Sequence, residues 1–131
     1  MASAIYPKFK EALLSGTYNL TSVAVRAVLV DTGTYTYNAA HDFYADLSGV
    51  VGTESGALGS KTVTNGVFDA ADITFTAVTG NTAEAIVLFV DTGDAATDAL
   101  IAYIDSATGL PFTPNGGDGN VAWNASGIFA L

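Results

Sequence analysis

The sequence predicts a mainly β protein, an antiparallel β-sandwich of jelly-roll-like type with an N-terminal amphipathic helix and one further short helix. The unbroken apolar run 85–90, Ala-Ile-Val-Leu-Phe-Val, indicates a strand buried on both faces, because a half-exposed strand would alternate. A second apolar run at 100–104 follows the turn-forming stretch 91–98, so the two runs predict the paired middle of a sheet. Ile73 and Phe75 alternate with threonines, as in a strand with one solvated face.

Length and cysteine content limit the class of protein. A chain of 131 residues forms one domain, residues 1–131, and buries roughly two-thirds of its unfolded surface without covalent cross-links. The sequence contains no cysteine, which excludes thiolate zinc sites and thiol catalysis. No secretion signal is recognisable and no apolar run is long enough to span a bilayer, so we expect a soluble protein made in the cytoplasm.

Charge and hydropathy indicate what the protein binds. Thirteen acidic and four basic side chains give a net charge of −9, which repels nucleic acid and anionic membranes. Charged residues make up 13% of the chain, against about 25% in ordinary soluble domains. Half of the residues are hydrophobic, so a monomer would leave apolar surface in water. We therefore expect a partner protein or further copies of the chain to cover part of that surface.

The first 16 residues differ from the rest of the chain. Ile5, Phe9 and Leu13 recur at i, i+4 and i+8, which predicts an amphipathic helix from about Ser3 to Leu14. A serine at the start can cap the first turn, and Ser15-Gly16 ends the helix.

Lys8 and Lys10 give this predicted helix a cationic side on an anionic protein. Two interpretations stay open. The helix either packs on its own sheet, or residues 1–16 form an arm that docks on a neighbouring subunit.

Two further elements are expected in the first half of the chain. From Thr21 to Val30 apolar residues fill both faces, which predicts a strand with little exposure. Ala40, Phe43 and Leu47 recur at i, i+3 and i+7, which predicts about two turns of helix between residues 38 and 47.

The middle of the chain is expected to hold a loop and a hairpin. Residues 48–60 contain four glycines, among them Gly52 and Gly56, and predict a long mobile loop that carries a contact. Asn65-Gly66 separates the segments 61–64 and 67–68, which predicts a hairpin with a two-residue turn.

The C-terminal part begins with a loop, because two prolines and several glycines between residues 108 and 120 exclude regular structure. Leu110 and Phe112 are expected to anchor this loop. The apolar segments 121–123 and 128–131 predict a final hairpin with a packed chain end.

A repeated Asp-Thr-Gly sequence invites an enzymatic interpretation. The sequence occurs at 31–33 and 91–93, each time after an apolar strand, as in aspartic proteases. That chemistry requires two aspartates that share one proton. Each copy would head a lobe of only about 60 residues, and Asp-Thr-Gly is also ordinary turn chemistry, so we favour the turn interpretation.

Other chemical sites are weaker still. His41 has no second histidine for a metal, and a capping or surface role is favoured. The aspartates of 91–98 and the segment 116–120 offer oxygen ligands that could hold calcium. Tyr35, Tyr37, Tyr44 and Trp123 could form a platform for a sugar, although aromatic residues on strands more often pack inside. We therefore expect no catalytic residue, no cofactor, no metal and no enzyme activity.

Short motifs spread over nearly the whole chain carry a family resemblance. They are the opening Met1–Phe9, the turn Val30–Tyr35, His41–Phe43, Lys61–Val67, Leu100–Asp105, Ala107–Pro111, Thr113–Gly117, Trp123 and the closing Ile128–Leu131. In this order they resemble a family of small virion structural proteins of tailed bacteriophages. The resemblance implies a structural component without enzyme activity.

Charge and shape favour one position in the particle. An acidic chain without a fibrous repeat suits the outer capsid surface better than the DNA-facing interior or a long fibre. We therefore expect a capsid cement protein that binds the major capsid protein, bridges neighbouring capsomers and forms a homotrimer. The alternatives are a tail or head-tail component and a carbohydrate-binding module for host attachment. The expected docking residues are Ile5, Lys8, Phe9, Lys10, Leu13, Gly52, Gly56, Leu110 and Phe112.

Overall fold

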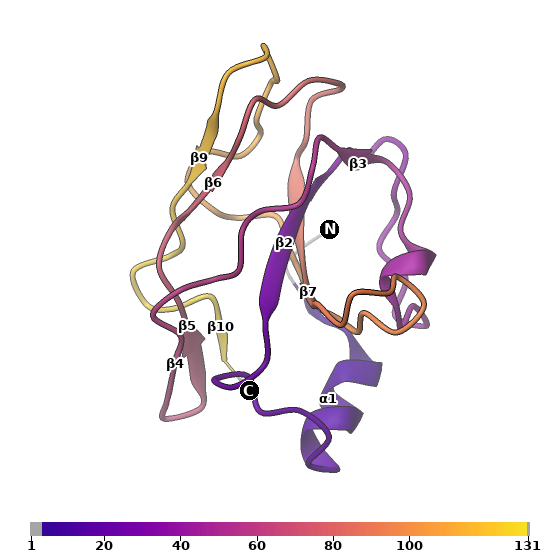
Figure 1. Cartoon of the computed structure of the whole chain (residues 1–131), viewed down its shortest axis with the longest axis vertical. Coiled ribbons are helices and arrows are strands. Elements are labelled where there is room, and N and C mark those ends of the chain that lie inside the picture. Colours follow the sequence, from indigo (N-terminus) through magenta and orange to yellow (C-terminus); the bar gives the residue numbers. More distant parts are fainter. Residues whose placement is uncertain (1–3, 131) are drawn as a thin grey trace.

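The computed structural model describes residues 4–130 and has a mainly β architecture, with antiparallel sheets and one α-helix (Figure 1). The elements in chain order are β1 (Ala4–Ile5), α1 (Pro7–Leu14), β2 (Val25–Val30), the 3-10 turn η1 (Tyr44–Asp46), β3 (Val50–Val51), β4 (Thr62–Thr64), β5 (Val67–Asp69), β6 (Ile73–Phe75), β7 (Ala85–Val90), β8 (Leu100–Ile104), β9 (Gly119–Val121) and β10 (Phe129–Ala130).

The core of the protein is a five-stranded antiparallel sheet with the strand order β1-β8-β7-β2-β3. All six residues of β7 and all five of β8 are buried, and the two strands are neighbours. The prediction of a paired sheet centre built from these two apolar runs is therefore confirmed. Strand β2 is also buried and lies on the other side of β7 along its whole length, so β7 occupies the middle of the sheet.

The two faces of this sheet are covered by different parts of the chain. On one face, Tyr44 packs edge-on against Phe89, and Tyr103 contacts Tyr35 and Tyr37. On the other face, Ile104 lines clefts together with residues of the C-terminal segment 126–130. Figure 1 shows the smaller sheets on one side of β2 and β7, with η1 and long loops on the other.

The smaller sheets pair in an order that differs from the prediction. The segments 61–64 and 67–68 form the predicted hairpin as β4 and β5, and both Asn65 and Gly66 have positive φ, as a two-residue turn of type I′ requires. The predicted hairpin of 121–123 with 128–131 is wrong. Strand β9 pairs with β6 and strand β10 pairs with β5, so the C-terminal segments join earlier parts of the chain.

The N-terminal helix is shorter than expected. Helix α1 begins at Pro7, and Ala4–Ile5 form strand β1 against Ala102 and Tyr103. Proline is well placed in the first turn, because the amide that it lacks has no partner within the helix there. The predicted cap, Ser3, lies outside the described residues.

The predicted length of the second helix is wrong. Only η1, three residues long, is helical between residues 38 and 47. The amide of Leu100 donates to the carbonyl of Asp42, and the amide of Tyr44 donates to that of Asp98. These bonds and the bridge between Phe43 and Ala99 hold Phe43 extended beside the start of β8, so no helix can form before Tyr44.

The glycine-rich segment 48–60 has more regular structure than a loop prediction implies. Strand β3 pairs with the end of β2, and the amides of Ser55 and Leu58 donate to the carbonyls of Ala27 and Val25. The segment therefore covers the outer edge of β2, which protects that edge from pairing with another chain. Within residues 4–130, no helix has the length and apolar character needed to cross a membrane.

Candidate functional site

An apolar groove lies where the end of α1, the following loop, the β4–β5 hairpin and β10 meet. We call it the β4 groove, and its volume is about 470 Å³. Its apolar lining residues are Leu13, Tyr18, Leu20, Val63, Phe68 and Phe129, together with the polar Asn19 and Thr21. Most of the lining is apolar, so water in the groove makes few hydrogen bonds and is readily displaced by apolar side chains.

Two exposed apolar residues adjoin the β4 groove. Val63, on β4, is 55% exposed, and Leu14, which follows Leu13 at the end of α1, is 88% exposed. All three residues of β4 are exposed, whereas its partner β5 buries Phe68. A single exposed leucine is ordinary, but two next to an apolar groove make a patch of the kind that binds protein.

The groove carries no charge of its own. None of its lining residues is acidic or basic, and the stretches 12–30 and 55–68 contain no aspartate or glutamate. The two basic residues of these stretches are engaged, because Arg26 donates to Asp91 at 2.6 Å and the Lys61 ammonium donates to the carbonyl of Val23. The lining of the groove is therefore uncharged, and the nearest carboxylates along the chain are Glu11 on α1 and Asp69 on β5.

The predicted docking residues of the N-terminal region do not form one surface. Phe9 is 1% exposed and stacks on Tyr18 with 5.6 Å between the ring centres, so it packs inside the protein and is not available for docking. Ile5 is half-buried in β1, and Leu13 lines the β4 groove. Lys8 and Lys10 are exposed, and neither makes an ion pair with a described residue. Of the two interpretations of the helix, this packing favours the one in which α1 belongs to its own fold.

The remaining predicted docking residues lie elsewhere. Gly52 has a φ of +72°, and a side chain there would touch Val78. Gly56 is exposed and has open space around it. Phe112 and Ala83 exchange backbone hydrogen bonds, and the Phe112 ring lies directly over Gly119, so Phe112 anchors its loop as predicted. Leu110 is half-buried at a separate polar cleft.

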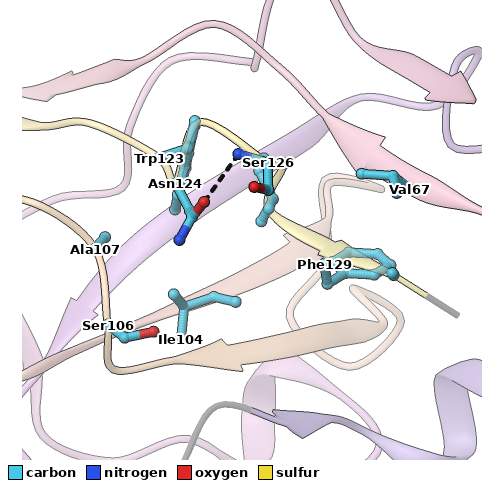
Figure 2. A pocket seen from close by; sticks show the side chains of 11 residues that line it. Val67, Ile104, Ser106, Ala107, Trp123, Asn124, Ser126 and Phe129 are labelled. Atoms are coloured by element: carbon cyan, nitrogen blue, oxygen red, sulfur yellow. Dashed lines mark hydrogen bonds between the residues drawn. The ribbon is translucent and has the colours of Figure 1, made fainter.

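A second cleft, of about 320 Å³, lies between the end of β8 and the C-terminal segment (Figure 2). Ile104, Trp123 and Phe129 form its apolar part, and Asn124 and Ser126 form a polar part in which the Asn124 side chain accepts the Ser126 amide at 2.8 Å. None of its lining side chains is ionisable. The cleft therefore holds the hydroxyls of Ser106 and Ser126 but no ionisable side chain that could act as a general acid or base.

A cluster of tyrosines fixes the N-terminal region to the sheet. The hydroxyls of Tyr6 and Tyr35 are hydrogen-bonded at 2.7 Å, and the Tyr35 hydroxyl is bonded to Nδ1 of His41 at 2.9 Å. Burial, followed by the bond to Tyr35, raises the pKa of Tyr6, and burial also raises the pKa of Tyr35. The single histidine thus has a structural partner.

The proposed sugar platform is not formed. Tyr35 is buried, Tyr44 packs on Phe89, and the indole N–H of Trp123, itself 7% exposed, donates to a backbone carbonyl. The four aromatic rings named for it contribute to packing and do not present a common exposed face.

The two Asp-Thr-Gly turns lie at opposite ends of the sheet. Each aspartate accepts the amide of its own glycine, Asp31 from Gly33 at 2.9 Å and Asp91 from Gly93 at 3.0 Å. Strands β2 and β7 are antiparallel, and the amide of Asp91 donates a hydrogen bond to the carbonyl of Ala24, just before β2. Seven extended residues, about 24 Å, therefore separate the aspartates, which cannot share a proton within one chain.

The acidic turn 91–98 is likewise held by its own hydrogen bonds. Asp98 accepts the amide and the hydroxyl of Thr92, each at 2.6 Å, and Asp94 accepts the amide of Ala96. Among residues 4–130, no group of three or more His, Cys, Asp or Glu side chains is arranged to hold a metal ion. These carboxylates therefore serve turn geometry.

Sequence reasoning missed most of the β4 groove. Leu13 was the only one of its residues among the predicted docking residues, while Val63 and Phe129 were assigned only to local elements and Tyr18 to none. The helical spacing could have indicated Leu14, because it falls outside the stripe of Ile5, Phe9 and Leu13. No local signal marks Val63, whose exposure depends on which strands pair.

Comparison with known proteins leaves this surface as the main guide to function. No protein-family model matches the chain, and no curated protein sequence matches it.

Proposed function

We propose that the chain is a structural protein of a tailed-bacteriophage virion, and specifically a capsid cement protein that binds the outer shell and bridges neighbouring capsomers. The observation that carries the proposal is the uncharged apolar surface of the β4 groove, with its exposed lining residue Val63 and the exposed neighbour Leu14. Burying apolar surface stabilises a complex by about 25 cal/mol per Å². A surface of this kind on a small acidic protein favours adhesion to other protein.

The charge distribution supports the choice of partner. The net charge of −9 disfavours contact with packaged DNA and favours the outer face of the shell. The proposed partners are the major capsid protein and further copies of the chain, which the sequence leads us to expect as a trimer. The exposed Lys8 and Lys10 offer a cationic edge to an acidic neighbour.

We also propose that the sheets form a β-sandwich. The five-stranded sheet and the smaller sheets beside it are compatible with a β-sandwich. A rigid sandwich can contact several capsomers at once, and such simultaneous weak contacts add up to firm binding on a shell. A jelly-roll-like connection of the strands stays a prediction.

The proposal is tested by mixing the purified chain with shells of the corresponding phage that lack it, and measuring co-sedimentation. Leu14→Lys should weaken binding at least tenfold, about 1.4 kcal/mol, because it places a charge beside the groove. Ala96→Lys, in an exposed turn on another part of the surface, adds the same charge and should bind as the unchanged chain does. Failure of the unchanged chain to bind shells would contradict the proposal, and binding to isolated tails instead would favour the tail component.

A further inference from the structure

We propose that strand β4 pairs antiparallel with β4 of a second copy of the chain, around a two-fold axis at Val63. This contact goes beyond shell binding, and it is separate from the three-fold contacts of the expected trimer, because a two-fold axis joins only two copies. It rests on the open edge of β4, on a row of apolar side chains that ends there, and on a strand sequence that is complementary to itself.

The hairpin geometry leaves the backbone of Val63 without a partner in β5. Strands β4 and β5 are joined by the two-residue turn Asn65-Gly66, so the pair that flanks the turn, Thr64 and Val67, is hydrogen-bonded. In an antiparallel pair, hydrogen-bonded and non-hydrogen-bonded residues alternate. Val63 and Phe68 are therefore a non-hydrogen-bonded pair, and the N–H and C=O of Val63 point outward from the sheet edge.

An apolar row crosses the small sheet and stops at this edge. Phe129 on β10 is opposite Phe68 on β5, and Phe68 is opposite Val63 on β4. Residues directly opposite each other share a face, and the two phenylalanine rings are 5.3 Å apart. Phe68 is 2% exposed, whereas Val63 at the end of the row is 55% exposed. A further strand beside β4 would cover the end of the row.

The sequence of β4 identifies that strand as another β4. Thr62-Val63-Thr64 reads the same in both directions, so antiparallel pairing around Val63 places valine opposite valine and threonine opposite threonine. The two outward-facing Val63 backbones would exchange two hydrogen bonds. Pairs of β-branched residues and pairs of threonines are among the favourable cross-strand neighbours. The apolar row would then continue across the axis into the second copy.

Charge also permits this contact between two anionic copies. The edge strand β4 contains no carboxylate, and the one carboxylate of the hairpin, Asp69, lies opposite Thr62 on β5, the strand behind the edge. An edge lysine often prevents such pairing, but the Lys61 ammonium is bonded to the carbonyl of Val23. The long strands β2 and β8 of the main sheet are not open in this way, because segment 55–58 lies along β2 and β1 lies along β8.

The chain has no cysteine, so one introduced thiol reports the contact. In Val63→Cys the paired Cα atoms would lie about 5.5 Å apart, within the range of a disulfide. Thr62→Cys is the matched control, because its two copies would lie about 8 Å apart, beyond that range. Both variants are oxidised mildly at high protein concentration, without shells, and the disulfide-linked dimer is measured over time.

We expect Val63→Cys to form the dimer at least about tenfold faster than Thr62→Cys, since pairing raises the effective thiol concentration. Equal rates, or a faster Thr62→Cys, would overturn the proposed pairing. In sedimentation experiments, Val63→Lys should weaken self-association of the cysteine-free chain at least about tenfold, and unchanged self-association would also overturn it. Failure of shell binding alone leaves these results unaffected, so the two proposals are tested separately.

Discussion

Replacing Phe9 with alanine removes the ring that holds α1 on the protein. Phe9 is 1% exposed and stacks on Tyr18 with an interplanar angle of 16°. Its neighbour Tyr6 is also fully buried and bonded to Tyr35. The ring of Phe9 therefore fills space between the helix and the following loop, beside a cleft of about 290 Å³ that it lines together with Tyr18.

The expected loss follows from that burial. Truncation of a buried phenylalanine to alanine costs about 3 to 5 kcal/mol, which includes the cavity term. Each kcal/mol lowers the melting temperature of a domain of this size by about 4 °C, so Phe9→Ala should melt roughly 12 to 20 °C lower. Leu14→Ala, on the same helix but 88% exposed, should change the unfolding free energy by less than about 0.5 kcal/mol.

The assay is urea unfolding of the two variants and the unchanged chain, followed by tryptophan fluorescence of Trp123, which is buried. A detached docking arm would give another result. Phe9→Ala would then unfold at the urea concentration of the unchanged chain and lose only shell binding. Equal midpoints for Phe9→Ala and Leu14→Ala would therefore refute the packing of α1 described above.

Three further predictions concern turns and ionisable groups. Gly109→Ala should lower the free energy of unfolding by about 1 to 3 kcal/mol, measured by thermal unfolding. The φ angle of Gly109 is +106°, and a Cβ there would lie 2.4 Å from a backbone oxygen. Gly56→Ala is the control and should leave the stability unchanged, because there is open space around Gly56. The raised pKa of Tyr6 means that its stabilising contribution is complete below about pH 10 and is lost as pH rises beyond it, so Tyr6→Phe should show a flatter decline of unfolding free energy in alkaline buffer. The bond from Arg26 lowers the pKa of Asp91, so its contribution is present above about pH 4 and disappears as pH falls through that lowered pKa. The deficit of Asp91→Asn in urea unfolding should therefore be largest at neutral pH and vanish in acid; a pH-independent deficit would contradict this assignment.

The central sheet could be predicted from sequence because its signal is local. The continuous apolar runs that became β7 and β8 are buried on both faces, as is most of β2, which only Arg26 interrupts, and such runs are visible without knowledge of their partners. The turn Asn65-Gly66 specified its hairpin in the same way, since only a tight turn suits two positive φ angles.

The errors arose where pairing joins distant segments. The spacing of Ala40, Phe43 and Leu47 resembles a helix, but Phe43 is extended and pairs with Ala99 beside the start of β8. Strand β9 pairs with β6, about 45 residues earlier, so adjacency in sequence misled the prediction of a final hairpin. The candidate site was lost for the same reason, because Val63 becomes an exposed end of an apolar row only once β5 and β10 have paired.

The most direct test of a protein-binding surface at the β4 groove is amide hydrogen exchange of the intact chain at low and high concentration, and with shells. We predict that the Val63 amide, which points away from β5, exchanges rapidly in dilute protein and becomes protected when copies or shells are present. Exchange at Val63 and along the end of α1 that stays equally fast under all three conditions would contradict the account.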